Sequence, residues 1–299
     1  MLALLFPGQG AHDVKMLDGV RGLPAFRDRY ELVAATLGSS PLDEIGAGNA
    51  AYLNQNRVTA LLTLLVSSLS LDAYHEKTGS RADLVAGYSV GQWTALYAAG
   101  ALSFDELVAV VARRSALMDA CFVDTPGAML AVIGVRSEAL EQLCARLRDD
   151  GHPVWVSNYN CVGQYTLAGT ATAIVAAEAA VAELKPRKAA RVPVSGAWHS
   201  PLLEAAHAHF KAYLSDVPLA PMRVPVIDNV TGDVLPSDRP RLDTQLARHL
   251  DHPVLWEKGI KTLLERGARR FVEIGYGNVL TKFGFFIDRS VEHEAFYVS

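Results

Sequence analysis

Two hydrophobic patterns alternate along this chain: short continuous apolar runs, and longer stretches whose apolar positions recur at helical spacing. Residues 2–6 and 84–86 are short runs of the kind that form buried strands. Residues 56–74 and 104–120 are long enough to form helices with extensive apolar surface. Because buried strands that alternate with helices are typical of a parallel sheet covered by helices, the pattern predicts an α/β fold.

The order of the elements changes near residue 124. From there the pattern predicts a strand, a helix, two strands, a helix and a final strand, over residues 128–135, 137–148, 154–158, 164–168, 170–184 and 191–194. This order is ferredoxin-like. We therefore expect a small ferredoxin-like lobe of residues 125–194, inserted into a core made of residues 1–124 and 195–299.

One serine stands where a predicted strand turns sharply into a predicted helix. Gly87 and Gly91 flank Ser89 at the spacing G-x-S-x-G, directly after the apolar run 84–86. Glycines fit so tight a turn because they have no Cβ, and the turn lifts the hydroxyl to a helix N-terminus, where backbone N–H groups can stabilise an oxyanion. The segment predicts a nucleophilic Ser89 in an α/β-hydrolase-like core, with a tight structural turn as the alternative.

A second glycine-rich turn, Pro7-Gly8-Gln9-Gly10, follows the first predicted strand. Glycines let backbone N–H groups approach whatever binds at that edge of the sheet. An oxyanion-hole loop and a plain structural turn both remain open for this segment.

A nucleophilic serine needs a base, and His199 is the best candidate among nine histidines. It lies in the glycine-bearing segment 195–201, immediately after the predicted lobe returns to the core. Such a loop can carry an imidazole into a cleft between the two units, within reach of Ser89.

Composition narrows the class of protein. The chain is 50% hydrophobic and can bury a full core, while its long apolar stretch at 61–71 is too short to span a bilayer. Cys121, Cys144 and Cys161 are widely spaced, which favours a reducing, cytoplasmic setting over a disulfide or zinc framework. The net charge of −4 argues against general nucleic-acid binding. We expect a cytoplasmic monomer with no metal, no nucleic-acid partner and no membrane association.

Taken in order, these motifs resemble the malonyl-CoA:acyl-carrier-protein transacylase family, which includes the discrete acyltransferases of fatty acid and polyketide synthesis. The matching segments cover nearly the whole chain: 6–10, 87–91, 114–118, 127–129, 158–169, 196–200, 229–232, 253–256 and 273–280. The resemblance implies a malonyl transfer from malonyl-CoA through an ester at Ser89 to the phosphopantetheine thiol of an acyl carrier protein. Coenzyme A thioester is then the substrate, and no bound cofactor is implied.

The resemblance also implies roles for further residues. His199 acts as the general base and is oriented by a backbone carbonyl near His249, and the backbone N–H groups of Gln9 and Val90 form the oxyanion hole. Arg114 holds the malonyl carboxylate, since a buried guanidinium can donate two parallel hydrogen bonds to it. The implied substrate-binding set is Arg114, Met118, Tyr88, Trp198 and His249.

Four positions depart from the family pattern. Tyr88, Gln92, Trp198 and His249 stand where histidine, glutamate, phenylalanine and glutamine are usual. Because Tyr88 and Trp198, together with Val90, line the expected acyl pocket, the acyl group is less firmly implied than the chemistry. By its volume, Trp198 favours malonyl over branched acyl groups.

A basic cluster offers a candidate docking surface for an acidic carrier protein. Its members are Lys185, Arg187, Lys188 and Arg191. Complementary charge would steer the carrier to this surface, although a solvated helix end explains the cluster equally well.

Three functions remain open from the sequence. The first is malonyl transfer, or transfer of a different acyl group by the same chemistry. The second is an editing hydrolase that removes acyl groups from carrier proteins, which Arg114 disfavours and which Tyr88 and His249 keep open. The third is a non-catalytic docking module.

Overall fold

The computed structural model describes residues 1–10, 12–49 and 51–298. The larger unit contains a five-stranded sheet in the order β7-β2-β1-β8-β9, and every neighbouring pair is parallel. Its strands are β1 (Leu2–Phe6), β2 (Leu84–Gly87), β7 (Val226–Ile227), β8 (Arg270–Ile274) and β9 (Glu292–Phe296). The central strand β1 matches the predicted run 2–6, and β2 includes the predicted run 84–86.

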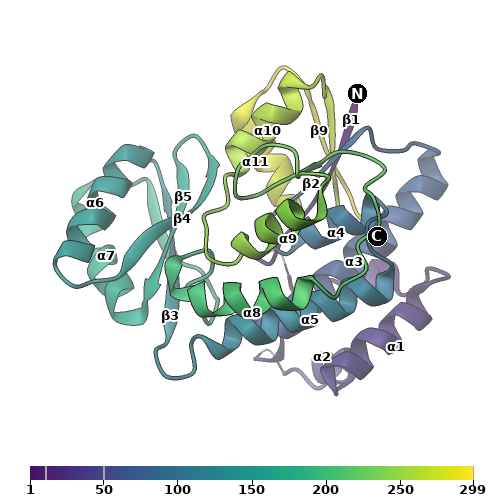
Figure 1. The fold of residues 1–299 in the computed structure, drawn as a ribbon, viewed down its shortest axis with the longest axis horizontal. Helices are drawn as coiled ribbons and strands as arrows, with labels where there is room; N and C mark the ends of the chain where they lie inside the picture. The colour runs from purple at the N-terminus through teal and green to yellow at the C-terminus, as the bar shows by residue number, and fades with distance from the viewer. Residues whose placement is uncertain (11, 50, 299) are drawn as a thin grey trace.

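Helices cover both faces of this sheet (Figure 1). Their bounds are α1 (Phe26–Leu37), α2 (Pro41–Gly46), α3 (Asn56–Thr78), α4 (Gly91–Ala98), α5 (Phe104–Ala120), α8 (Glu204–Leu214), α9 (Arg239–Arg248), α10 (Trp256–Glu265) and α11 (Val279–Ile287).

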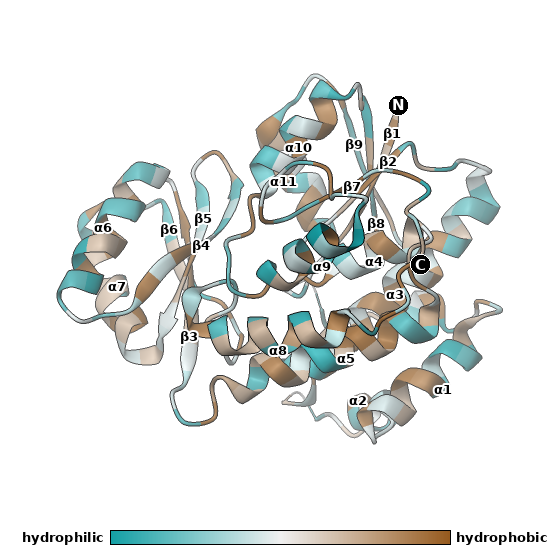
Figure 2. Ribbon diagram, viewed as in Figure 1, coloured by the Kyte–Doolittle hydropathy of each residue, from teal (hydrophilic) through white to brown (hydrophobic). Residues whose placement is uncertain are grey.

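The alternation of side chains along β1 divides the core into two layers. Leu4 and Phe6 pack into the cluster formed with α3, α4 and α5, whereas Ala3 and Leu5 pack into the cluster formed with α10. A strand that is buried on both faces must be apolar at every position, which explains why 2–6 is a continuous run. Figure 2 shows hydrophobic residues along α3 and β1 and hydrophilic ones on the outer turns of α6 and α9.

Helix α3 fills the space beneath the sheet. By length and composition it could cross a membrane, but 83% of its most hydrophobic 18-residue segment is buried inside the fold, as expected of a central core helix. It runs four residues beyond the predicted 56–74, to Thr78. Gly79 then ends it in a left-handed conformation with φ of 66°.

The smaller unit has an antiparallel sheet with two helices on one face, at the left of Figure 1. Along the chain it consists of β3 (Gly127–Ile133), α6 (Ser137–Asp149), β4 (Val154–Cys161), β5 (Gln164–Thr170), α7 (Ala171–Glu183) and β6 (Lys188–Arg191). The strand order is β4-β5-β3-β6. Leu130, Val132 and Leu167 pack beneath α6 and α7, while Met129 and Ala168 on the opposite face join the main core.

The last strand of this sheet lies earlier than predicted. The sequence predicts it at 191–194, but the residues that pair with β3 are Lys188–Arg191. Pro193 has no N–H to donate to a sheet, so the chain leaves the sheet there although Val192 and Val194 are apolar. Those two valines line a cavity next to Ser89 instead.

Helix α5 carries Arg114 and begins with a capping box. The Ser103 side chain accepts a hydrogen bond from the Glu106 N–H, and the Glu106 carboxylate accepts one from the Ser103 N–H at 2.7 Å. This arrangement satisfies two N–H groups that the first helical turn would otherwise leave free.

We expect Ser103→Ala to lower the free energy of unfolding by about 0.5–2 kcal/mol, the usual loss on removal of an N-cap side chain. Chemical denaturation measures the change. The exposed Ser237→Ala serves as the control, and equal stability of the two variants would contradict the capping role of Ser103.

Candidate active site

Ser89 sits on the sharp turn between β2 and α4, where its φ is 52°. A left-handed residue other than glycine is uncommon and typical of a nucleophile elbow. A Cβ at Gly87 would lie 1.9 Å from the carbonyl oxygen of Gly91, and a Cβ at Gly91 would lie 2.2 Å from that of Phe6. Both glycines are therefore required by close backbone approach, and together they hold the serine at the edge of the sheet.

His199 reaches Ser89 from the segment that follows the small unit. The Ser89 Oγ and the His199 Nε2 are 2.7 Å apart, and the His199 Nδ1 is 2.9 Å from the backbone oxygen of His249. A carbonyl oxygen can only accept, so Nδ1 must carry the ring hydrogen of the neutral imidazole. This leaves Nε2 free to accept the proton of the serine hydroxyl.

The surroundings keep His199 neutral. Its side chain is buried, and this burial, reinforced by the positive charge of Arg114, lowers the pKa of His199 to about 3. At neutral pH the imidazole is therefore unprotonated, as a general base must be.

Asn229 supports the elbow through its backbone and side chain, and we did not anticipate this role. Its Oδ1 accepts from the Ser89 N–H at 2.7 Å, its Nδ2 donates to the Gly87 oxygen at 2.6 Å, and its N–H donates to the Gln92 Oε1 at 2.7 Å. The motif N-V-T-G at 229–232 was the available signal. These bonds also give Gln92 a structural role behind the elbow.

The two predicted oxyanion donors, the N–H groups of Gln9 and Val90, have no acceptor in the described structure, whereas the Ser89 N–H already has one. Within the described part of the chain, no backbone or side-chain acceptor binds the N–H of Gln9 or that of Val90. Ser89 uses its own N–H on Asn229 and has none to offer. The geometry thus leaves Gln9 and Val90 with free donors beside the serine, as stabilisation of an oxyanion requires.

A small cavity of about 80 Å³ borders Ser89 and brings five of the predicted site residues together. Its lining residues are Gln9, Tyr88, Ser89, Met129, Asn158, Thr166, Val192, Val194, Trp198 and His199. Trp198 forms part of the wall, and its ring packs edge-on against that of Phe122 with 5.3 Å between the centroids.

Tyr88 ties the elbow to the smaller unit. Its hydroxyl donates to the Asn160 Oδ1 at 2.6 Å and accepts from the Asn158 Nδ2 at 2.8 Å. Both asparagines lie on β4, so this position, which departs from the family pattern, forms a polar bridge across the cleft.

Arg114, Met118 and the ring of His249 do not line this cavity. Arg114 is completely buried on α5, and burial lowers its pKa to about 10, so it remains charged at neutral pH. None of its three guanidinium nitrogens has a hydrogen-bond partner among residues 1–10, 12–49 and 51–298. Met118 is buried one turn further along, and the His249 ring packs 5.2 Å from that of His199.

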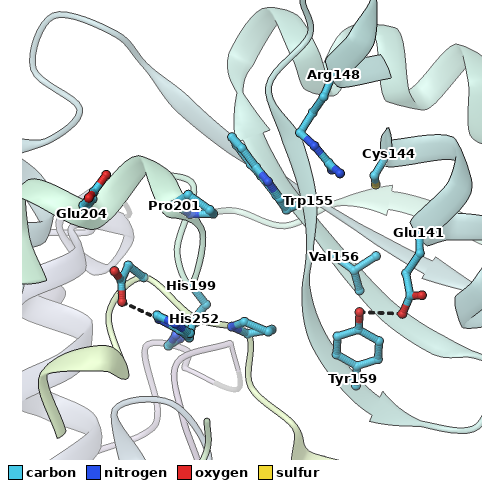
Figure 3. Close-up of a pocket in the computed structure, with 12 residues that line it drawn as sticks. Glu141, Cys144, Arg148, Trp155, Val156, Tyr159, His199, Pro201, Glu204 and His252 are labelled. Atoms are coloured by element: carbon cyan, nitrogen blue, oxygen red, sulfur yellow. Dashed lines mark hydrogen bonds and ion pairs between the residues drawn. The ribbon is translucent and has the colours of Figure 1, made fainter. Parts of the chain in front are cut away.

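A larger cavity of about 400 Å³ opens between the two units and reaches His199 (Figure 3). Trp155 and Tyr159 of β4 line one side together with Arg148 of α6. Three carboxylates surround it, those of Glu141, Glu204 and Asp251. Its rim is therefore predominantly acidic.

The four predicted docking residues lie away from both cavities, in and before β6. Lys185, Arg187, Lys188 and Arg191 are all exposed. Arg191 binds Glu178 through two hydrogen bonds of 2.7 Å each, which offsets its charge. The structure therefore leaves three cations for a partner: Lys185 at the C-terminal end of α7, Arg187 in the following loop and Lys188 at the start of β6.

No cluster of three or more metal-ligating side chains occurs in the part of the chain that the structure describes. The chemistry that this site offers rests on Ser89, His199 and the nearby backbone N–H groups.

Comparison with known proteins agrees with this geometry. The family described as "Acyl transferase domain" matches residues 6–285, and the chain belongs to this family. Within it the relatives include the malonyl CoA-acyl carrier protein transacylase of Bacillus subtilis (strain 168), which is 33% identical over 94% of this chain and 88% of its own length. The corresponding protein of Escherichia coli (strain K12) is 30% identical over 93% of this chain and 90% of its own.

Solved structures share the whole fold. MCAT from Streptococcus pneumoniae has a TM-score of 0.89 at 30% identity and covers 100% of this chain and 97% of its own. A malonyl-transacylase solved in complex with a type II PKS acyl-carrier protein, PlMCAT:AntF, has a TM-score of 0.91 at 27% identity, covering 98% and 94%. The predicted family and the α/β fold with a separate antiparallel sheet are confirmed.

The depressed pKa of His199 predicts an unusual pH profile. We expect the rate of serine acylation to change little between about pH 7.5 and 5.5, whereas a base with the ordinary pKa of 6.5 would lose roughly tenfold. Single-turnover acylation measures this rate. A tenfold loss over that range would contradict the neutral, buried state of His199.

Proposed function

We propose that this protein transfers a malonyl group from malonyl-CoA to the phosphopantetheine thiol of an acyl carrier protein, through an ester at Ser89. The observation that carries the proposal is the buried Arg114, whose guanidinium has no hydrogen-bond partner among the described residues and whose charge lowers the pKa of His199 in the hydrogen-bonded Ser89–His199 pair. The names of the relatives and structural neighbours support the same reaction.

In the first half-reaction the Ser89 oxygen attacks the thioester carbon while its proton passes to the His199 Nε2. The backbone N–H groups of Gln9 and Val90 hold the resulting oxyanion. When the carbon–sulfur bond breaks, His199 returns the proton to the sulfur, and coenzyme A leaves as a thiol. The hydrogen bond to the His249 carbonyl stabilises the transient imidazolium.

In the second half-reaction the leaving group is the Ser89 oxygen, and the nucleophile is the phosphopantetheine thiol of the carrier protein. Its proton passes to His199, its sulfur attacks the ester carbon, and the departing Ser89 oxygen recovers the proton. Because both displacements use one serine, the kinetics are ping-pong.

Arg114 sets the acyl class. A completely buried guanidinium without a partner is unfavourable, and a carboxylate bound in the fork geometry satisfies two of its donors at once. Met118 and Trp198 shape the neighbouring space, and Tyr88 closes the side toward β4. His249 contributes through its carbonyl and its packing on His199.

The carrier docks on the face that bears Lys185, Arg187 and Lys188. From there its arm enters past Val192 and Val194, which lie directly after β6 and line the smaller cavity. The larger cavity borders β4, at the opposite edge of the sheet, and its three carboxylates would repel an acidic carrier and the coenzyme A phosphates.

The remaining details belong to the same proposal. The elbow supports an α/β-hydrolase-like description of the core, residues 1–124 and 195–299, and the strand order supports a ferredoxin-like lobe at 125–194. We propose a cytoplasmic monomer that acts without a bound cofactor or metal and binds neither nucleic acid nor membranes.

The decisive experiment incubates the protein with labelled malonyl-CoA, with and without an acyl carrier protein. We expect one malonyl group on the peptide that contains Ser89, transfer of the label to the carrier, and loss of both in a folded Ser89→Ala variant. Mass spectrometry locates the group. Release as free malonate would support the editing hydrolase, and absence of any covalent label would support the docking module.

We expect Arg114→Ala to lose malonyl transfer but to gain relative activity on acetyl-CoA. Loss of the charged partner of a buried carboxylate costs roughly 2–5 kcal/mol, whereas an acetyl group never makes this contact. The ratio of kcat/KM for the two thioesters measures the switch, and the exposed neighbour Arg113→Ala is the matched control. Equal losses on both thioesters would remove the malonyl assignment.

A further inference from the structure

The side chain of Gln9 is hydrogen-bonded to Asn56. Its Nε2 donates to the backbone oxygen of Asn56 at 2.9 Å and to the Asn56 Oδ1 at 3.0 Å. Asn56 is the first residue of α3 and is almost completely buried. The loop of residues 7–10 is thus hydrogen-bonded to the N-terminal end of α3.

Asn56 is fastened in turn to α5. Its Nδ2 donates to the Asp119 Oδ1 at 2.9 Å and approaches the backbone oxygen of Ser115 at 3.5 Å. A carboxylate only accepts hydrogen bonds, so Asp119 fixes the orientation of the Asn56 amide, with Nδ2 toward α5 and Oδ1 toward Gln9. The three side chains form one chain of hydrogen bonds across three segments.

The loop that is held in this way is intrinsically loose. Gly8 and Gly10 flank Gln9, and Gly10 has a φ of 120° that other residues rarely adopt. A peptide between two glycines has many accessible orientations, yet a donor to an oxyanion must point at one place. The anchoring of the Gln9 side chain restricts the orientation of the Gln9 backbone.

We propose that Asn56 and Asp119 are positioning residues for acyl transfer, which hold Gln9 so that its backbone N–H faces the thioester carbonyl at Ser89. The inference rests on the proposed function. Asn56 and Asp119 do not line the cavity next to Ser89, and their hydrogen bonds connect to it through Gln9, which does.

Asp119 also lies near enough to Arg114 for their charges to interact, so the two effects must be separated. An oxyanion donor stabilises the transition state of every acyl group, because each has the same thioester carbonyl. Arg114 contacts only acyl groups that carry a carboxylate. An effect on positioning therefore lowers kcat equally for malonyl-CoA and acetyl-CoA, and an effect through Arg114 lowers it for malonyl-CoA alone.

The test is a double-mutant cycle on Gln9 and Asn56, read as the single-turnover rate of serine acylation with both thioesters. Gln9→Ala removes the anchor but keeps the backbone N–H, and we expect it to lose on the order of tenfold, less than the 10²–10³ for a deleted donor. Asn56→Ala should lose a similar factor alone and little more in the Gln9→Ala background. Additive losses would show that Asn56 does not act through Gln9 and would overturn the inference.

Two aspartate variants complete the test. Asp119→Ala should lose roughly the same factor on both thioesters, while Asp119→Asn, which retains an acceptor for the Asn56 amide, should restore most of the rate. A loss confined to malonyl-CoA would assign Asp119 to Arg114 and overturn its positioning role. Thermal unfolding confirms that each variant is folded. If Asn56→Ala does not fold, the same cycle on Gln9→Ala and Asp119→Ala carries the test, and additive losses there would overturn the inference.

The proposed function is judged separately by the wild-type protein. If wild-type Ser89 accepts acetyl but no malonyl, the malonyl assignment fails while the double-mutant cycle still decides the role of Asn56. If malonyl transfer proceeds and the cycle is additive, only the positioning inference fails.

Discussion

The hydrogen bond between Ser89 and His199 depends on the meeting of three segments that are far apart in the sequence. The elbow after β2 presents the hydroxyl, the segment after the small unit presents the imidazole, and the residue that ends α9 presents the carbonyl that orients it. Because parallel strands place their carboxyl ends at one edge of a sheet, the core brings the serine and the opening loop together there. The segment that carries His199 reaches this edge where the small unit returns to the core, and the His249 carbonyl reaches it from the end of the core helix α9.

Polar contacts connect the two units at the site, in addition to the apolar packing of Met129 and Ala168 on the main core. Tyr88 on the elbow bonds to Asn158 and Asn160 on β4, while Asn229 clamps the elbow from the core side. A buried polar network specifies geometry more narrowly than apolar contact does, because each lost bond leaves an unsatisfied group. The serine is therefore held from two sides, in a backbone conformation that a free chain would rarely adopt.

The local parts of this structure could be predicted from the sequence, whereas of the long-range contacts only those of His199, with Ser89 and with the His249 carbonyl, were predicted. The strand 2–6, the helix 104–120 and the elbow at Ser89 are encoded by neighbouring residues, through periodicity and glycine spacing. The final strand of the small unit was predicted too late in the sequence, at 191–194, because an apolar segment with two valines resembles a strand. Pro193 is the local signal that the chain leaves the sheet there. Asn229, Asn56 and Asp119 gain their partners from distant segments, and of the three only Asn229 was marked by its neighbours, through the motif N-V-T-G. The burial of Arg114 was likewise a property of the packed fold.

The buried charge of Arg114 bears on the lifetime of the proposed acyl-enzyme. In the resting protein the guanidinium is completely buried and has no hydrogen-bond partner within the described structure, although Asp119 lies near enough for the two charges to interact. Under the proposed function, a carboxylate tethered through the serine ester would neutralise that charge without any cost of association. The malonylated protein would then be better paired internally than the free protein, and Arg114 would prolong the intermediate as well as select it. In the proposed mechanism the buried guanidinium therefore favours acyl groups that carry a carboxylate. A thioester without a carboxylate leaves the hydrogen-bond donors of Arg114 unsatisfied.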